Sequence, residues 1–493
     1  MFKTVFPLKM KKMKNRYSNK KTSMRNVIIL FTALILFSCN QTIKNKNTQL
    51  NNDLVIVSDS ISQLMAKYHY NPKELNENDY LKLEEDIHKL AKTVETKKEF
   101  IEGFNQLWSD GPFSHVRLTK TEKPADEMAR FIDSLRVGNQ SVSLNWEGKT
   151  AILTVTTMTG VDTKEQVFEA YREIAKKNTE ALVIDLRNNE GGTFAGVPLV
   201  GHLIKEPMDV GMFVSKKWWE NNTAEPNKND IKTLSPWEGW SIKAFWKDVQ
   251  EQQLTRVRFK PMLPHFDGAV YVLTSKKTAS AAELTVDAMA QLQKVTIIGE
   301  KTAGKMLSQK MFDLPYGLQL SLPIADYYST RMGRIEGAGV EPDIAIDQSV
   351  AMNLAMSLIN GEELNKAIAA LQEELNKMGE EPLEGGEVYL FGNMNDWGKK
   401  WEASPKFAYK GKGVYETTIK LKKGSYEFKI APMNWDFDFG AKPNRGKMTL
   451  GTETSLIKEP GSDNLRIELT EETELIFRLN LSNPIKATLT IND

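Results

Sequence analysis

Ser280 occupies a position in the sequence that suits covalent chemistry. It follows an apolar, β-branched run at 270–274 (VYVLT) and a polar turn at 275–278, and it precedes a segment with apolar residues at helical spacing. This pattern predicts a buried strand, a turn and a helix that begins at Ser280. A hydroxyl at such a junction can face a substrate, and the helix N-terminus offers backbone N–H groups to a developing oxyanion. Taken alone, the position is more typical of a helix N-cap serine than of a nucleophile.

A second junction of this kind lies at residues 181–192. An apolar run (ALVIDLR) is followed by a polar turn that ends in Gly191 and Gly192. Alternating residues at 141–158 predict paired strands before it, and a helix is predicted over 164–177. Strand, glycine turn and helix are typical of a βα unit in an α/β domain. Adjacent glycines allow close approach of a ligand to the backbone, although most such pairs mark only a turn.

The remaining parts of the chain must position these junctions. Residues 53–110 carry a helical pattern with breaks near 70–72 and 93–96. The interval 118–141 is too short for another domain. Residues 207–262 are read as polar loops that hold five tryptophans, which either line a peptide groove or pack the loops onto the core. After 305, strands alternate with turns up to about 345.

The start of the chain predicts export. Basic residues between positions 9 and 25 precede the eleven-residue apolar run 27–37, which is too short to span a bilayer but typical of a signal-peptide core. The run ends in Leu36-Phe37-Ser38-Cys39, which resembles the lipobox of bacterial lipoproteins, and Cys39 is the only cysteine. We expect residues 1–39 to be a lipoprotein signal peptide and 40–52 a flexible tether. The alternative is an ordinary signal peptide with a chance cysteine.

Composition narrows the classes of function. The net charge of +1 gives no basic field for nucleic acid. Five scattered histidines give no metal-ligand spacing, and no phosphate-binding glycine loop is present. No cofactor or metal is therefore expected.

Four motifs occur in one order along the chain: 185–192 (DLRNNEGG), 278–283 (TASAAE), 298–305 (IGEKTAGK) and 336–343 (EGAGVEPD). Together they resemble the core of the tail-specific (carboxy-terminal processing) and tricorn-core serine peptidases. The resemblance implies an α/β (α+β) core of the ClpP/crotonase-like type over 119–350, with an N-terminal helical cap over 53–118. The PDZ domain that many such peptidases carry has no room here.

By this resemblance Ser280 is the nucleophile and Lys305, 25 residues downstream, is its general base. A lysine acts as a base only when neutral, so its surroundings must lower its proton affinity. The oxyanion hole would use backbone N–H groups near Gly191 or Gly192 and of Ala281. Tricorn-like relatives instead use a histidine from a Ser-His pair and a downstream glutamate, which His115 and Glu336 match.

Three residues of these motifs also have purely structural interpretations. His115 could be a histidine at the start of a strand, and Glu336 could hold the glycine-rich loop. Glu283 could serve as a charge in the first helical turn.

The end of the chain predicts a different domain. A helical connector and an acidic linker (351–386) lead to short alternating strands over 387–493, which predict an all-β, immunoglobulin-like sandwich. Residues 388–397, 413–416 and 424–429 resemble early-set, glycogen-binding-like modules of pullulanases. The resemblance makes Trp397, Trp401 and Trp435 candidate sugar platforms, unless they pack inside the domain.

The sequence thus predicts an exported, lipid-anchored bacterial serine endopeptidase, in the periplasm or at the outer membrane. We expect it to cleave unfolded or extended polypeptide through an acyl-enzyme at Ser280. The alternative is a non-catalytic envelope protein that binds peptide or glycan.

Overall fold

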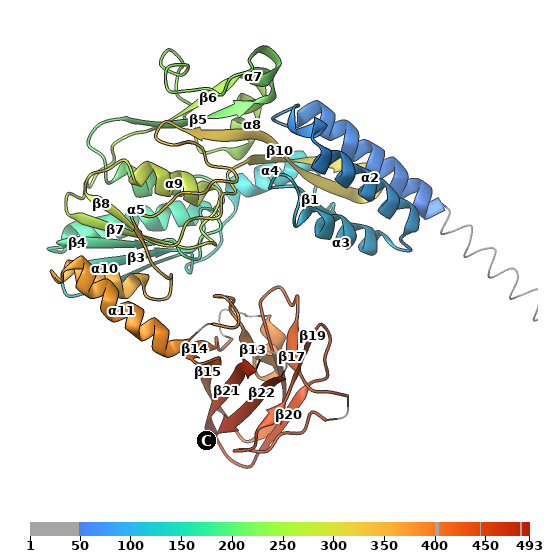
Figure 1. Cartoon of the computed structure of the whole chain (residues 1–493), viewed down its shortest axis with the longest axis vertical. Coiled ribbons are helices and arrows are strands. Elements are labelled where there is room, and N and C mark those ends of the chain that lie inside the picture. The colour runs from blue at the N-terminus through green and yellow to red at the C-terminus, as the bar shows by residue number, and fades with distance from the viewer. Residues whose placement is uncertain (1–48, 380, 400–403, 444, 484–485) are drawn as a thin grey trace, which may run out of the picture. The chain divides into compact units, whose positions relative to one another are not determined.

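The computed structural model describes residues 49–493 except 380, 400–403, 444 and 484–485 (Figure 1). The chain divides into two compact units, the first ending at Gln348 and the second beginning at Ser349. Each unit has its own hydrophobic core. The predicted signal peptide with Cys39, and residues 40–48 of the predicted tether, lie outside the described residues.

The first unit begins with helices that each bury one apolar face. A helix over residues 49–68 buries Leu54, Val57 and Ile61, which lie on one side because they are three or four residues apart. It is followed by η1 (Glu74–Asn76), α2 (Asn78–Thr93) and α3 (Lys97–Trp108). The predicted helical pattern is confirmed. Residues 49–52, which were assigned to the tether, are also helical, because Leu50 packs against the core.

A six-stranded sheet in the order β12-β8-β7-β4-β3-β2 is the centre of this unit. Its strands are parallel apart from the antiparallel pair β2–β3. The strands are β2 (Val142–Glu147), β3 (Thr150–Val155), β4 (Ala181–Asp185), β7 (Ala269–Thr274), β8 (Val295–Gly299) and β12 (Ile344–Ala345). Its helices are α5 (Val161–Lys176), α6 (Gly196–Gly201) and α9 (Ala281–Met289). Because β4 and β7 are parallel neighbours, the segments that follow them meet at one edge of the sheet.

A second sheet of the same unit is antiparallel and has the order β1-β10-β5-β6, with β9 and β11 also paired to β10. Its strands are β1 (Arg117–Lys120), β5 (Met208–Ser215), β6 (Leu254–Phe259), β9 (Ser308–Leu314), β10 (Leu318–Ser329) and β11 (Gly333–Arg334). The associated helices are α4 (Ala125–Ser134), α7 (Lys216–Asn221), α8 (Ile242–Glu251) and η2 (Pro315–Gly317). Between β1 and β2 the described chain holds only α4 as a regular element.

The interpretation of residues 207–262 as polar loops was wrong. This segment contains β5, α7, α8 and β6. Its polar residues suggested loops, but several of them pair with one another on adjacent strands. Asp209 on β5 accepts hydrogen bonds from both Arg256 and Arg258 on β6, so three charges lie in a strand pair. The strand face beneath them buries Val210, Met212 and Val214.

The second unit starts with α10 (Ala351–Ile359) and α11 (Leu364–Met378) and continues as two antiparallel sheets. One sheet pairs β13, β16, β17, β19 and β20, and the other has the order β14-β15-β21-β22-β18. Phe428 and Phe477 meet edge to face in the core, with ring centroids 5.3 Å apart. The predicted all-β C-terminal domain is confirmed. Its elements are β13 (Tyr389–Gly392), η3 (Asn393–Gly398), β14 (Ala408–Gly411), β15 (Val414–Leu421), β16 (Gly424–Ala431), β17 (Asp438–Gly440), β18 (Thr454–Ser455), β19 (Ile457–Glu459), β20 (Leu465–Leu469), β21 (Thr473–Asn483) and β22 (Lys486–Asn492).

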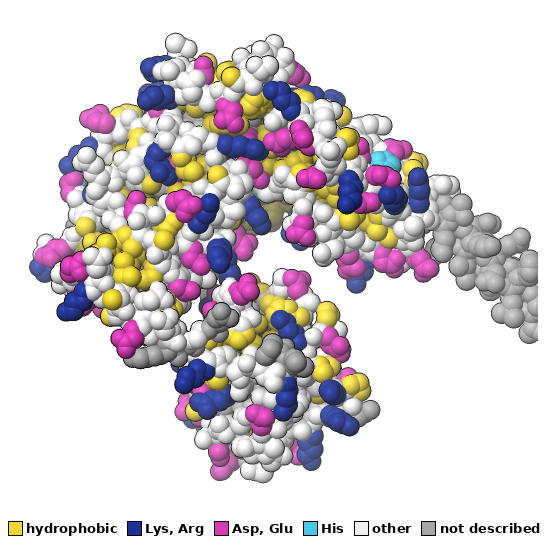
Figure 2. Space-filling model, in the orientation of Figure 1, with side chains coloured by type: hydrophobic (Ala, Val, Ile, Leu, Met, Phe, Trp, Pro, Cys, Tyr) yellow, Lys and Arg dark blue, Asp and Glu magenta, His cyan; other side chains and the backbone are white. Residues whose placement is uncertain are grey.

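The surface carries both signs of charge. On the face shown in Figure 2, Lys and Arg side chains are interspersed with Asp and Glu. No helix in the described part of the chain is long and apolar enough to cross a membrane. Within residues 49–493, outside the gaps named above, His, Cys, Asp and Glu nowhere gather in threes that could hold a metal ion.

Candidate active site

Ser280 lies between β7 and α9, as predicted, in a strained backbone conformation. Its φ of 55° and ψ of −125° are rare for a residue other than glycine and cost on the order of 1–3 kcal/mol. The backbone N–H of Ser280 donates to Oε2 of Glu283 (3.0 Å), and that of Ala279 donates to the carbonyl of Asn189 (3.1 Å). These bonds hold the strained turn. In this conformation Oγ of Ser280 lies 3.4 Å from Nε2 of His115.

His115 is backed by Ser114 and Glu336. Nδ1 of His115 lies 2.6 Å from Oγ of Ser114. The backbone N–H of Ser114 donates to Oε1 of Glu336 (3.0 Å), and that of Met306 donates to Oε2 of the same carboxylate (2.6 Å). The structure therefore connects the four side chains in the order Ser280, His115, Ser114 and Glu336. This is the geometry of a serine nucleophile, an imidazole base and groups that orient the base.

The surroundings of His115 keep its ring neutral. Burial, and secondarily the positive charge of Lys305, lower the pKa of His115 to about 4. A neutral imidazole can accept a proton, which a general base must do. Burial raises the pKa of Glu336, while hydrogen bonds from Ser114 and from the N–H of Met306 oppose that rise. Because it accepts hydrogen bonds from Ser114, the Glu336 carboxylate can orient that residue.

Lys305, the base expected from the resemblance, is placed differently. Its side chain is exposed, and its backbone N–H donates to Oε2 of Glu283 (2.8 Å). Among the described residues, no hydrogen bond joins Nζ of Lys305 to Ser280. A lysine serves as a base only in its neutral form, which burial favours and water opposes. The contact that the structure does show for this ammonium is electrostatic, because its charge lowers the pKa of His115.

Glu283 is a residue of the site that the sequence reasoning undervalued. Its side chain is fully buried. Oε1 accepts hydrogen bonds from Oγ1 of Thr302 (2.6 Å) and the N–H of Gly304 (2.7 Å), while Oε2 accepts from the N–H groups of Ser280 and Lys305. One carboxylate therefore fixes both the nucleophile and the loop after β8. The spacing Ser-x-x-Glu, a helix capping signature, was the available signal.

The predicted oxyanion groups lie beside Ser280. Gly191 has a φ of 93°, and a Cβ there would lie 2.7 Å from Cβ of Ser280 and 2.9 Å from N of Ala281. Only glycine fits this contact. The N–H of Gly191 already donates to Oδ1 of Asn189 (2.9 Å). Within the described chain, the N–H groups of Gly192 and Ala281 have no such acceptor, so these two are the free donors nearest the nucleophile.

Residues 149–346 match the family model described as Peptidase family S41. These residues are therefore similar to an S41 peptidase domain, and we call them the S41 domain. The match includes Ser280, Lys305, Glu336 and the oxyanion glycines, whereas His115 and Ser114 precede it. The S41 domain supports the expected class, a serine-type peptidase. The placement of His115 beside the nucleophile rests on the structure alone.

Two relatives illustrate the extent of the S41 likeness. A carboxyl-terminal-processing protease from Picosynechococcus is 26% identical over 187 residues, which cover 38% of this chain and 36% of that protein. The carboxy-terminal processing protease CtpB of Bacillus subtilis is 27% identical over 186 residues, which cover 38% and 32%. The chain thus matches about a third of the length of these curated relatives. The solved structure of a lipoprotein from Streptococcus agalactiae aligns with a TM-score of 0.42 at 14% identity, covering 62% of this chain and 95% of that chain.

The second unit also matches a family model. Residues 387–481 match the model described as Pullulanase X25 domain, so the resemblance to a pullulanase module is supported. Of the proposed sugar platforms, Trp401 lies outside the described residues. Trp435 stacks on Phe391 with ring centroids 5.1 Å apart, so one of its faces is covered. Trp397 is 37% exposed and keeps a free ring surface.

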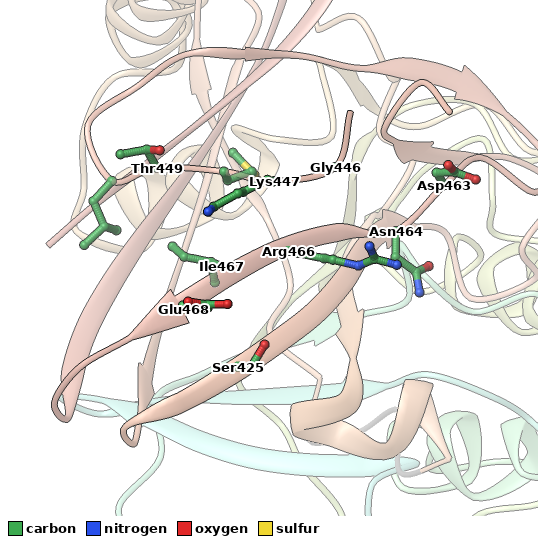
Figure 3. Close-up of a pocket in the computed structure, with 11 residues that line it drawn as sticks. Ser425, Gly446, Lys447, Thr449, Asp463, Asn464, Arg466, Ile467 and Glu468 are labelled. Carbon is green, nitrogen blue, oxygen red and sulfur yellow. The ribbon is translucent and has the colours of Figure 1, made fainter. Parts of the chain in front are cut away.

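A cavity of about 580 Å³ lies elsewhere in the X25 domain (Figure 3). Its lining combines charged side chains, Lys447, Asp463 and Glu468 among them, with the apolar side chains of Met448, Leu450 and Ile467. Arg466 and Asn464, which also line it, both donate to Glu427. No aromatic side chain is among its described lining residues, so it lacks the ring face on which a sugar would stack. The cavity and the tryptophans are separate features of the domain.

Proposed function

We propose that this chain is a serine endopeptidase that cleaves extended or unfolded polypeptide through an acyl-enzyme at Ser280. The observation that carries the proposal is the 3.4 Å approach of the Ser280 hydroxyl to Nε2 of a neutral His115 inside a site backed by Ser114 and Glu336. The S41 domain supports the reaction class. The curated relatives are named as proteases, which supports a polypeptide substrate.

The reaction follows from the order of these groups. The Nδ1–H of His115 donates a hydrogen bond to Oγ of Ser114. Nε2 is then unprotonated and can accept the proton of the Ser280 hydroxyl. Oγ attacks the scissile carbonyl, and the N–H groups of Ala281 and Gly192 bind the oxyanion. His115 then gives the proton to the leaving amine as the C–N bond breaks. Water, deprotonated by His115, hydrolyses the ester and restores Ser280.

His115 is preferred to Lys305 as the base on geometric grounds. Nε2 of His115 is the basic atom within reach of Oγ, and an apo distance of 3.4 Å is compatible with a bond that tightens when substrate binds. The exposed Lys305 acts through its charge. It keeps His115 unprotonated at acidic pH and lies where it would also favour the negative charge that develops on the substrate.

The test uses the full chain with Ser280→Ala, His115→Ala and Lys305→Met, and Lys301→Met as a control. Lys301 lies in the same loop and pairs with Glu341 (2.8 Å). Each protein is treated with a serine-reactive fluorophosphonate and with casein. We expect wild type and both lysine variants to cleave casein, and the serine and histidine variants to lose at least 100-fold. A wild type that neither labels nor cleaves would refute the proposal.

We further propose that the protein is exported and anchored to the bacterial cell envelope through lipid on Cys39. The basic segment, the apolar run 27–37 and the lipobox-like residues 36–39 support this location. Metabolic labelling with an alkyne fatty acid tests it. Labelled wild type and unlabelled Cys39→Ser are expected, and equal labelling of the two would overturn the anchor.

A second candidate activity concerns the X25 domain. The match to a pullulanase domain and the exposed ring of Trp397 support glycan binding. Affinity electrophoresis in gels with and without glycogen or pullulan tests it. Retardation of wild type but not of Trp397→Ala would support a sugar platform, and unchanged mobility of wild type would reject it. Glycan binding with no casein cleavage would favour a non-catalytic binding protein.

A further inference from the structure

Phe194 follows the oxyanion loop of the S41 domain along the chain, and two tryptophans that precede α8, Trp237 and Trp240, pack against it. Phe194 stacks on Trp237 with ring centroids 5.0 Å apart and an interplanar angle of 21°. Trp240 meets Phe194 edge to face at 6.4 Å. We call these three side chains the aromatic wall. The proposed chemistry uses none of them, so their arrangement needs another explanation.

Neighbouring side chains and a backbone hydrogen bond hold the rings of the aromatic wall in place. Phe245 of α8 is buried and contacts both Phe194 (6.1 Å) and Trp237 (5.1 Å) between ring centroids. The backbone N–H of Trp237 donates to the carbonyl of Arg256 (2.9 Å). Nζ of Lys164 lies 4.2 Å from the ring centroid of Trp240. The rings are therefore fixed in place before any ligand binds, which lowers the entropic cost of binding.

The aromatic wall lies close to the nucleophile along the chain. Gly191 is packed against Ser280, since a Cβ there would lie 2.7 Å from Cβ of Ser280. Phe194 is three residues beyond Gly191, and three residues span at most about 11 Å. An extended substrate advances about 3.3 Å per residue. Phe194 is therefore within reach of a substrate side chain about three residues or fewer from the scissile bond, and the Trp240 ring adjoins that of Phe194.

The aromatic wall also has free surface. Trp240 is 40% exposed, and Phe194 and Trp237 are partly exposed. Core packing explains the buried side of the cluster, where Phe245 and Phe213 meet edge to face at 5.0 Å. It does not explain an indole that remains 40% exposed beside Phe194. Large aromatic surfaces of this kind gain most by covering an apolar partner.

We infer that the aromatic wall is a substrate subsite that binds an apolar or aromatic side chain within about three residues of the scissile bond. This inference rests on the proposed peptidase function and names the substrate class: polypeptide segments whose apolar side chains are exposed because the chain is unfolded. A folded protein buries such side chains, so the subsite would also favour unfolded substrates.

Cleavage of quenched peptides by the full chain tests the subsite. The peptides differ only by Phe, Leu, Ser or Gly at each of three positions on either side of the cleaved bond. We expect wild type to prefer Phe or Leu over Ser at one position by about tenfold or more in kcat/KM. Trp240→Ala should reduce this preference to below about threefold, mainly through KM, and Trp240→Phe should retain most of it. Retention of the wild-type preference by Trp240→Ala would overturn the inference.

Two further measurements separate the subsite from the reaction and from general effects of losing a tryptophan. Trp146→Ala removes from β2 a partly exposed indole, which also has a lysine (Lys177) over its ring, and should leave the preference unchanged. Binding of the Phe and Ser peptides to Ser280→Ala, with and without Trp240→Ala, is followed by fluorescence anisotropy. Tighter binding of the Phe peptide that requires Trp240 supports the subsite even if no peptide is cleaved, in which case the proposed function fails. Equal binding of both peptides rejects the subsite.

Discussion

Replacing Lys305 with methionine separates the two possible general bases. The substitution removes the ammonium and keeps much of the side chain's length. If His115 is the base, the variant loses only the electrostatic influence of the charge on the imidazole. If Lys305 is the base, the variant loses the proton acceptor itself. The two cases differ in how far kcat/KM falls at alkaline pH and in the pH at which the acid limb of the kcat/KM profile lies.

The size of the electrostatic effect can be bounded from the structure. Burial and Lys305 together lower the pKa of His115 from 6.5 to about 4, and burial is the larger cause. Lys305 therefore accounts for less than half of that difference, which corresponds to at most about 2 kcal/mol. Without the cation, the imidazolium is less disfavoured, so the pKa of His115 rises. The acid limb should move to higher pH by up to about one unit.

The assay is kcat/KM for a quenched casein substrate between pH 4 and pH 9, with circular dichroism at each pH to show that the chain remains folded. At pH 8, where His115 is neutral in both proteins, Lys305→Met should retain activity within about threefold of wild type. Lys301→Met should leave the acid limb in place. A loss of 100-fold or more at pH 8, in the range that a general base contributes, would refute the assignment of His115 as the base.

Three further perturbations test other parts of the site. In Glu283→Gln an amide NH₂ replaces one carboxylate oxygen, so two of the four N–H or O–H groups that donate to Glu283 would face another donor. We expect kcat to fall at least tenfold with KM within threefold of wild type, and a wild-type kcat would contradict the role of Glu283 in positioning Ser280. Gly191→Ala should abolish fluorophosphonate labelling, because its Cβ would meet Ser280, whereas Gly138→Ala, which has the same φ of 93° but nothing within 4 Å, should label normally; labelling of both would contradict the contact. Burial lowers the pKa of His69 to about 3, so the unfolded chain binds more protons below pH 6.5 and the free energy of unfolding falls as the pH decreases. His69→Phe should remove about 3 kcal/mol of that fall between pH 7 and pH 4 in urea titrations, and an unchanged pH dependence would contradict the neutral, buried state.

The elements that position the nucleophile could be predicted because their signals are local. The buried run 270–274, the turn after it and the helical spacing from Ala281 onward lie within twenty residues. The parallel β4–β7 pair then explains why the turn with Gly191 reaches Ser280. The same holds for the sandwich, whose strand β21 alternates between buried and exposed residues over most of its length.

The sequence left the choice between Lys305 and His115 as the base open, because it depends on contacts between distant segments. His115 and Ser280 are 165 residues apart in the sequence. The spacing from Ser280 to Lys305 is preserved, but spacing does not reveal that the lysine side chain points into solvent. Strands β5 and β6 were missed for a related reason. Asp209 pairs with Arg256 and Arg258, and that pairing exists only in the folded chain.

The loop after β8 links the two carboxylates of the site, Glu283 beside Ser280 and Glu336 beside Ser114, through its backbone N–H groups. The N–H groups of Gly304 and Lys305 donate to Glu283, which also holds the N–H of Ser280. The next N–H along the chain, that of Met306, donates to Glu336, which holds the segment of His115 through Ser114.

Three consecutive residues, 304–306, thus bind both carboxylates; Glu283 also binds Ser280, and Glu336 also binds Ser114, the neighbour of His115. A displacement of this loop would release the strained backbone of Ser280 and the orientation of His115 together. If His115 is the base, as we propose, the glycine-rich motif at 298–305 contributes to the site mainly through the N–H groups of its backbone rather than through the ammonium of Lys305. A motif that suggests a lysine base would then serve a histidine base.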